Sequence, residues 1–194
     1  MFERFIVLWQ ILKYVEIALA GIWLHIPAAL ANMAPIVAKL LIPKWNTPVD
    51  FGLKYHGKEI LGSHKTYRGM VTGTLIGAIA FMTQRQLFSD FEVIRKISLF
   101  DYSSAPIFFG AWIGFCALTG DLVKSFFKRQ VEIKPGSPWI PFDEIDWILG
   151  SLAGLTVIYI PSVQIVVVSV SIYFLLNFLT SFIGFRLGIK SSPL

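Results

Sequence analysis

A carboxylate, a hydroxyl and an ammonium recur at helical spacing near the middle of the chain. Asp121, Ser125 and Lys128 stand at positions i, i+4 and i+7, so a helix would place all three on one face. A long apolar run precedes them, and ionisable groups at the edge of such a run usually point into a bundle or a water-filled cavity. The alternative, an ordinary helix end with positive flanking residues, explains the lysine but not Asp121.

An acidic pair follows after a short loop. Asp143 and Asp146 are three residues apart and share one helical face. Acidic residues also favour the first turn of a helix for electrostatic reasons alone, which is the simpler interpretation of this pair. If the loop returns the chain beside Asp121, however, three carboxylates meet at one depth. Oxygen ligands gathered in this way suit Mg²⁺, which binds a few carboxylates together with substrate phosphates.

Basic residues form a third candidate site at the end of an earlier polar loop. Lys65, Thr66 and Arg68 stand just before a glycine-spaced apolar segment. Arginine makes bidentate phosphate contacts and lysine adds a point charge. A positively charged flank of a membrane helix would look similar. His64 is a candidate base, although a lone loop histidine is more often structural or solvated.

The elements that must position these residues are membrane helices. Of the 194 residues, 55% are hydrophobic and only 15% are charged, which is too little polar surface to cover a soluble domain of this size. We expect an all-α, polytopic membrane bundle forming a single domain over residues 1–194. The five expected transmembrane spans are 17–42, 69–87, 105–127, 144–160 and 163–185. Residues 1–16 are expected either to extend the first helix or to lie in the membrane interface.

Lysine and arginine placement sets the expected orientation. Twelve of these residues fall in loops 39–68 and 124–143 and at the C-terminus, against five on the other side. The positive-inside rule therefore places both polar loops and the C-terminus in the cytoplasm and the N-terminus outside. This bias also explains the net charge of +5 without nucleic-acid binding. The active site is then expected to face the cytoplasm from the cell membrane.

Glycines four residues apart predict close helix packing. Gly73 and Gly77, Gly110 and Gly114, and Gly150 with Gly154 form such pairs. Small residues at this spacing let helix backbones approach closely in lipid.

Carboxylates for a metal, cations for phosphates and a surrounding bilayer together indicate nucleotidyl or phosphoryl transfer to a lipid. Two alternatives stay open at this point. One is a CTP-dependent kinase for a polyprenol or another lipid alcohol, which would attack the γ-phosphate. The other is an ion-coupled transporter in which Asp121 is the coupling site.

The order of these residues along the chain resembles a known signature. Gly120, Asp121, Ser125, Lys128, Arg129, Lys134, Pro135, Asp143 and Asp146 match the pattern of the CTP-dependent phosphatidate cytidylyltransferase superfamily. The short loop before Asp143, and Asn46-Thr47-Pro48 with Gly62 and Lys65–Gly69 upstream, are similar to its archaeal branch, the CDP-archaeol synthases. The segment Tyr55–Lys58 departs from that branch, where an Asp-Gly pair is expected.

The resemblance implies transfer of CMP from CTP to 2,3-bis-O-geranylgeranyl-sn-glycerol 1-phosphate, giving CDP-archaeol and pyrophosphate. It implies Mg²⁺ as cofactor, held by Asp121, Asp143 and Asp146, and catalytic roles for Asp121, Asp143 and Lys128. It further implies a CTP site, whose residues are Asn46, Lys65, Thr66, Arg68, Ser125, Lys128 and Arg129. The oligomeric state and the residues that recognise cytosine are left open.

Overall fold

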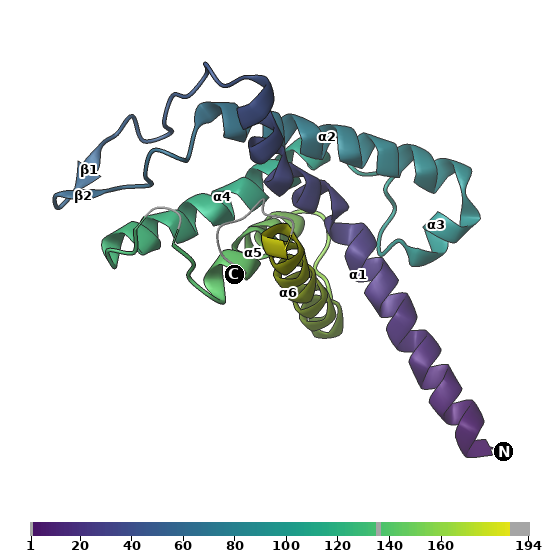
Figure 1. Ribbon diagram of the computed structural model, residues 1–194. Coiled ribbons are helices and arrows are strands. Elements are labelled where there is room, and N and C mark those ends of the chain that lie inside the picture. The colour runs from purple at the N-terminus through teal and green to yellow at the C-terminus, as the bar shows by residue number, and fades with distance from the viewer. Residues whose placement is uncertain (1, 135–136, 187–194) are drawn as a thin grey trace.

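The computed structural model describes residues 2–134 and 137–186 and is almost entirely helical (Figure 1). Its elements are α1 (Phe2–Leu41), β1 (Lys54–Tyr55), β2 (Lys58–Glu59), α2 (Tyr67–Asp90), α3 (Glu92–Ile97), α4 (Phe109–Gln130), α5 (Phe142–Leu155) and α6 (Val163–Arg186). The C-terminal residues 187–194, which are expected in the cytoplasm, and Pro135 of the expected signature lie outside the described residues.

Each of the five expected spans coincides with a helix, and the short α3 is an addition. Residues 2–16 form one continuous helix with the expected first span. Of the two expectations for this segment, the helix extension is confirmed. At 1.5 Å per residue, the 40 residues of α1 form a rod of about 60 Å. Its N-terminal part projects away from the other helices (Figure 1).

Among residues 2–134 and 137–186, two helices are long and apolar enough to cross a membrane, over Ile6–Leu41 and Val163–Ile183. Their outward residues are strongly exposed: Leu40 is 78% exposed and Leu175 63%. In contrast, α5 has 14 residues and ends at Leu155, short of the expected limit at 160 and of the roughly 20 residues that cross a bilayer core. That all five helices span the bilayer stays a prediction.

Glycines mark the points where helices approach most closely. A Cβ atom added to Gly77 would lie 2.7 Å from the carbonyl oxygen of Gly110 and 3.0 Å from the Cα of Gly114, so α2 and α4 cross there. A Cβ on Gly120 would lie 2.3 Å from the carbonyl oxygen of Asp146, and one on Gly150 would lie 2.3 Å from that of Cys116. The glycine spacing thus correctly indicated close packing, and it fixes α4 against both α2 and α5.

The polar segment between α1 and α2 is a structured loop held by its own hydrogen bonds. The Asp50 carboxylate accepts from the backbone N–H groups of Gly52 and Leu61, and the Val49 N–H donates to the carbonyl oxygen of Lys65 at 2.8 Å. The β1–β2 hairpin at its tip is held to the end of α4, where the Lys58 ammonium donates to the carbonyl oxygen of Gln130 at 2.7 Å. These contacts hold Lys65 beside α4.

Candidate active site between helices α2, α4 and α5

Three carboxylates from two helices converge on one ammonium group. The Nζ atom of Lys124 lies 3.1 Å from Asp121 Oδ1, 2.8 Å from Asp143 Oδ1 and 2.9 Å from Asp146 Oδ2. Asp121 and Lys124 belong to α4, and the other two belong to the first turns of α5. The close approach at Gly120 and Gly150 brings these helix faces together. The meeting of acidic groups expected from the sequence is therefore present.

Two further lysines complete the network. Lys65, just before α2, contacts Asp121 Oδ2 at 2.5 Å, and Lys128 contacts Asp143 Oδ2 at 2.8 Å. Asp146 and Lys128 are 8% and 7% exposed. Charges so deeply buried are tolerated only when they are paired and hydrogen-bonded. Three acidic and three basic side chains alternate here, so each charge has a partner of opposite sign.

Asp143 immediately precedes the expected fourth span, 144–160, and the expected topology places it at the edge of the network nearest to water. Burial alone would raise the pKa of its carboxyl group, but hydrogen bonds from Lys124 and Lys128 outweigh this and lower the pKa below its usual value. The backbone N–H of Trp139 also donates to Asp143 Oδ2 at 2.6 Å. Asp143 is thus held as a carboxylate, the form that a cation or a phosphate-binding lysine requires.

Lys124 is the site residue that the sequence reasoning missed. It follows Asp121 by three residues, a spacing that already placed both side chains on one helix face. Its sequence position is equally typical of the positive flank of a membrane helix, which is why spacing alone does not single it out. Its position at the focus of three carboxylates shows that it belongs to the site.

The donor set suits a hard divalent cation, with the Lys124 ammonium as a stand-in cation at the centre of the carboxylates. In the described part of the chain, no group of three or more Asp, Glu, His or Cys residues has the spacing that would hold a metal ion directly. The carboxylates are arranged around the ammonium instead. The residues therefore fit a metal in the chemistry of their oxygen donors, but Lys124 would have to move aside and the carboxylates would have to draw together to hold it.

The remaining predicted residues lie at different distances from this centre. Ser125 and Arg129 are buried on α4, and the Arg129 side chain packs beside Gly62 of the first loop. Thr66 caps α2, where its Oγ1 accepts from the Gly69 N–H at 3.3 Å. The Arg68 guanidinium donates to the carbonyl oxygen of Ile42 at 2.9 Å and so ties α2 to the end of α1.

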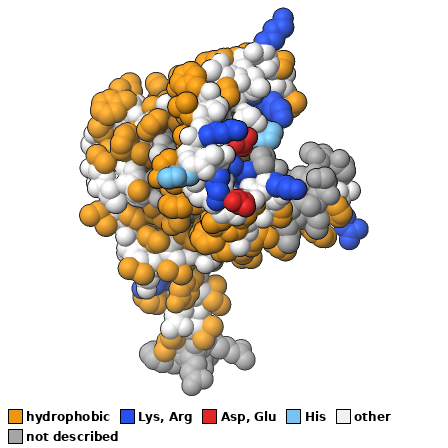
Figure 2. Space-filling model, turned by 90° about the vertical axis from the view of Figure 1, so that its left-hand side faces the viewer, with side chains coloured by type: hydrophobic (Ala, Val, Ile, Leu, Met, Phe, Trp, Pro, Cys, Tyr) orange, Lys and Arg blue, Asp and Glu red, His pale blue; other side chains and the backbone are white. Residues whose placement is uncertain are grey.

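Asn46 is exposed in the first loop. The structure therefore brings Lys65, Asp121, Lys128, Asp143 and Asp146 together, while Thr66 and Arg68 serve the backbone around them. On the face shown in Figure 2, basic and acidic side chains gather in one area of a mainly hydrophobic surface.

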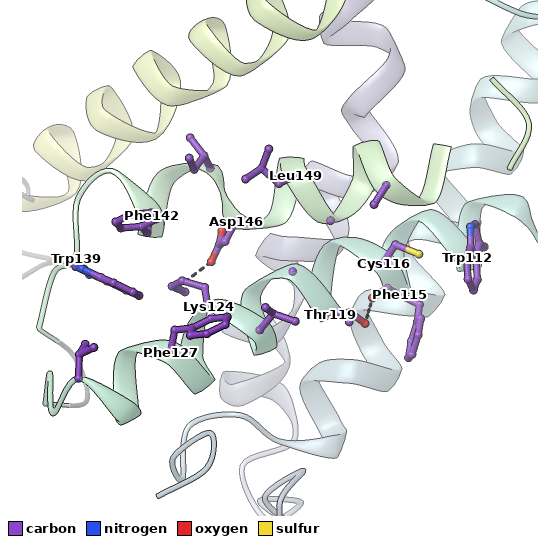
Figure 3. A pocket seen from close by; sticks show the side chains of 16 residues that line it. Trp112, Phe115, Cys116, Thr119, Lys124, Phe127, Trp139, Phe142, Asp146 and Leu149 are labelled. Carbon is purple, nitrogen blue, oxygen red and sulfur yellow. Dashed lines mark hydrogen bonds and ion pairs between the residues drawn. The ribbon is translucent and has the colours of Figure 1, made fainter. Parts of the chain in front are cut away.

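A largely apolar groove of about 770 Å³ lies between α4 and α5, and the Lys124–Asp146 ion pair of the charged network lies partway along it (Figure 3). Its lining residues are Trp112, Phe115, Cys116, Thr119, Gly120, Val123, Lys124, Phe127, Val131, Trp139, Phe142, Ile145, Asp146, Leu149, Gly150 and Ala153. In the close-up view, Lys124 and Asp146 face each other across the groove, among aromatic and aliphatic neighbours. The groove is thus suited to an amphiphile with an anionic head.

A smaller pocket of about 60 Å³ lies on the other side of Asp121. His64, Lys65 and Thr66 line it together with Asp121, and Pro35 and Leu122 are among its apolar walls. Asp121 therefore borders a polar pocket next to the first loop, while its neighbour Lys124 borders the apolar groove. Two ligands that approach from these two sides would meet at the carboxylates.

A solved structure indicates the class of protein to which this fold belongs. The chain is similar to a structure described as an intramembrane enzyme for archaeal membrane lipids biosynthesis, with a TM-score of 0.65 and 27% identity over 82% of this chain and 90% of that chain. The fold and the charged network beside an apolar groove thus define a helical enzyme of the intramembrane type.

Sequence comparisons identify the family. The CarS-like family, CDP-archaeol synthase, matches residues 14–194, and the chain belongs to this family. A CDP-archaeol synthase of Methanocaldococcus jannaschii is 30% identical over 91% of this chain and 97% of its own length. One from Thermofilum pendens is 31% identical over 95% of this chain and 84% of its own length.

Proposed function

We propose that this chain transfers CMP from CTP to the phosphate of 2,3-bis-O-geranylgeranyl-sn-glycerol 1-phosphate and releases pyrophosphate. The product is CDP-archaeol, an intermediate of archaeal phospholipid synthesis. The observation that supports this reaction best is a charged network that borders a lipid-sized apolar groove through Lys124 and Asp146. Family membership supports the same substrates.

Asp121, Asp143 and Asp146 are the residues that would hold Mg²⁺. A magnesium ion bound there would neutralise the charge of the triphosphate and orient it. Every other requirement of the reaction falls on side chains of the protein, because nucleotidyl transfer needs positioning and charge stabilisation more than a protein nucleophile.

Lys128, Arg129 and Lys65 would bind the triphosphate of CTP, with Ser125 as a hydrogen-bonding neighbour on α4. Lys65 borders the polar pocket beside Asp121, so CTP would approach from the side of the first loop. Thr66 and Arg68 would support this site by fixing the start of α2, and Asn46 is exposed to CTP that arrives from water. As the lipid phosphate oxygen bonds to the α-phosphorus, the bond between the α-phosphorus and the oxygen that bridges to the β-phosphate breaks. Lys128 would stabilise the charge on the departing pyrophosphate.

The groove supports lateral entry of the lipid. Its walls are largely apolar along α4 and α5, and Lys124 and Asp146 add charge partway along them. The isoprenoid chains would stay in the hydrocarbon while the phosphate reaches the network. We place this end of the molecule in the cytoplasm, with the protein as a multi-pass protein of the cell membrane.

A product assay tests the proposal. Purified protein is incubated with Mg²⁺, the ether-lipid phosphate and CTP labelled in the α-phosphate, and the products are separated. We expect labelled CDP-lipid together with unlabelled pyrophosphate. In a parallel incubation with a polyprenol and CTP labelled in the γ-phosphate, formation of CDP and a labelled lipid phosphate would instead identify a kinase. In proteoliposomes, CTP-independent transport of a solute would identify a transporter.

A further inference from the structure

One basic residue belongs to both halves of the site. Lys124 is the only lysine or arginine among the groove-lining residues in the described part of the chain, and its ammonium is also the centre of the carboxylate network. Lys65 and Lys128, in contrast, each contact one carboxylate and do not line the groove. Any anionic head that enters the groove therefore meets Lys124 before it meets another cation.

Lys124 and a metal ion compete for the same carboxylates. The ammonium lies within 3.1 Å of Asp121, Asp143 and Asp146, so a divalent cation on these oxygens would be placed next to it. Two cations at such a distance repel strongly in a buried site. The flexible four-carbon stem of lysine allows the ammonium to move while its base on α4 stays fixed.

We propose that Lys124 is the residue that binds the phosphate of the lipid substrate. Its ammonium neutralises the carboxylates while no metal is bound, and it turns into the groove once a divalent cation takes its place. There it forms a charge-assisted hydrogen bond with the lipid phosphate and orients it toward the α-phosphorus of CTP. The assignment rests on the proposed reaction and adds a substrate-binding residue to it.

Loss of the Lys124 charge should change two binding affinities in opposite directions. Removal of the Lys124 charge weakens lipid-phosphate binding, because no other groove-lining side chain replaces it. The same change strengthens divalent-cation binding, because an internal competitor is lost. If Lys124 only stabilised the fold, its substitution would weaken both lipid-phosphate binding and divalent-cation binding.

The first experiment measures binding without turnover. Wild type and Lys124→Met are titrated in detergent with Mn²⁺, followed by electron paramagnetic resonance. The thermal shift caused by 2,3-bis-O-geranylgeranylglycerol 1-phosphate is compared with that caused by the corresponding alcohol. We expect several-fold tighter Mn²⁺ binding by the variant and loss of the extra shift that the phosphate gives over the alcohol. Weaker Mn²⁺ binding, or an unchanged phosphate effect, would overturn the assignment.

The second experiment measures KM values. Lys124→Met should raise the KM for the lipid phosphate about tenfold or more, the effect of losing one charge-assisted hydrogen bond, and leave the KM for CTP within about twofold. Lys128→Met should show the reverse pattern. Lys96→Met, on the exposed α3, is the control for loss of a surface lysine. Equal increases in both KM values of Lys124→Met would contradict the proposal.

Lys124→Gln is the second variant, for the case that Met leaves the carboxylates too strongly unbalanced to fold. Its side chain is one atom shorter than that of lysine, but its amide can still donate hydrogen bonds without carrying a charge, and the same signs are expected. If the wild-type protein forms no CDP-lipid at all, the proposed reaction is wrong, but the Mn²⁺ and thermal-shift measurements still decide the role of Lys124.

Discussion

At the scale of single residues, the site depends on how three carboxylates are shared among three lysines. Asp121 alone contacts both Lys65 and Lys124. It therefore links the first loop, where CTP is proposed to bind, to the groove proposed for the lipid. No other carboxylate of the network touches Lys65 among the described residues.

The Asp121→Asn substitution tests this position. The amide keeps the size of the side chain but removes the charge that two lysines share, so we expect CMP transfer to fall by about 10²-fold or more. Elution from a sizing column and helical circular dichroism should stay unchanged, because the surrounding helices are fixed by their packing. Asp90→Asn, at the exposed end of α2, is the matched control and should keep full activity. Near-normal transfer by Asp121→Asn would refute its role.

Residue types and spacing predicted the acidic centre, but they did not predict the partner of every basic side chain. The positions of Asp121, Lys128, Asp143 and Asp146 follow from helical periodicity, which is local information. Arg68, in contrast, donates to backbone carbonyl groups of residues 42 and 43, and this partner is visible only once α1 and α2 are packed together. The tertiary fold therefore decides which basic residues bind substrate and which stabilise the backbone.

At the scale of the elements, the crossing of α4 and α5 sets the geometry of the catalytic centre. Glycine spacing predicted that close contacts exist, but not which helices share them. Gly120 and Gly150 meet only because the loop before Asp143 returns α5 alongside α4. The end of α5 at Leu155 was likewise not predicted, because the apolar sequence continues beyond it without a charge.

Gly150→Ala should damage activity through this crossing. The new methyl group would lie 2.3 Å from the carbonyl oxygen of Cys116 and 3.0 Å from the Gly120 nitrogen, and backbone atoms cannot rotate away. The helices must separate, which moves Asp146 relative to Asp121. We expect at least a tenfold fall in kcat/KM, since displacements of about 1 Å can cost 10²-fold.

Gly69→Ala is the comparison for that change. Its nearest neighbour is the Pro35 side chain at 3.1 Å, so a shift of a few tenths of an ångström relieves the contact. Gly69 lines the small pocket beside Asp121, but the nearest atoms to its added methyl group belong to Pro35 and Thr66 and not to α4 or α5. We expect activity close to that of wild type. Equal losses in the two variants would show that methyl groups between any of these helices are harmful and that the α4–α5 crossing has no special role.

Two buried serines allow the contribution of an interhelical hydrogen bond to the free energy of unfolding to be measured. Ser151 on α5 and Ser169 on α6 are both fully buried. The Ser151 hydroxyl lies 2.7 Å from His25 Nδ1 on α1, whereas the Ser169 hydroxyl has no hydrogen-bond partner among the described residues. We expect Ser151→Ala to lower the free energy of unfolding by about 0.6 kcal/mol, the average for interhelical hydrogen bonds in membranes, and by no more than about 1.7 kcal/mol. Ser169→Ala should be neutral or stabilising, as read from denaturant titrations in detergent micelles. Equal destabilisation in both variants would contradict this assignment.

At the scale of the whole molecule, the polar features divide between two ends. The first loop, the hairpin and the carboxylate network lie together, because Lys58 contacts the end of α4 and Lys65 contacts Asp121. The loop that contains α3 follows α2 at its other end, 24 residues away. Hydropathy and charge placement predicted this division and the helices between its two sides. They could not predict that α1 extends as one helix beyond the bundle, because its charged residues near position 16 fit an interfacial segment equally well.

Cysteine labelling tests the orientation of these two ends. In a Cys116→Ala background, Lys54→Cys places a thiol on the exposed hairpin, and Val93→Cys places one on α3, where the native side chain is 64% exposed. If the positive-inside rule holds for this chain, a membrane-impermeant maleimide should label Lys54→Cys only in inside-out vesicles and Val93→Cys only in intact spheroplasts. The reverse pattern would place the proposed active site outside the cell, away from CTP. Labelling of both positions from one side would show that α2 does not cross the membrane, so the network would lie on a bundle with fewer spans than the five predicted.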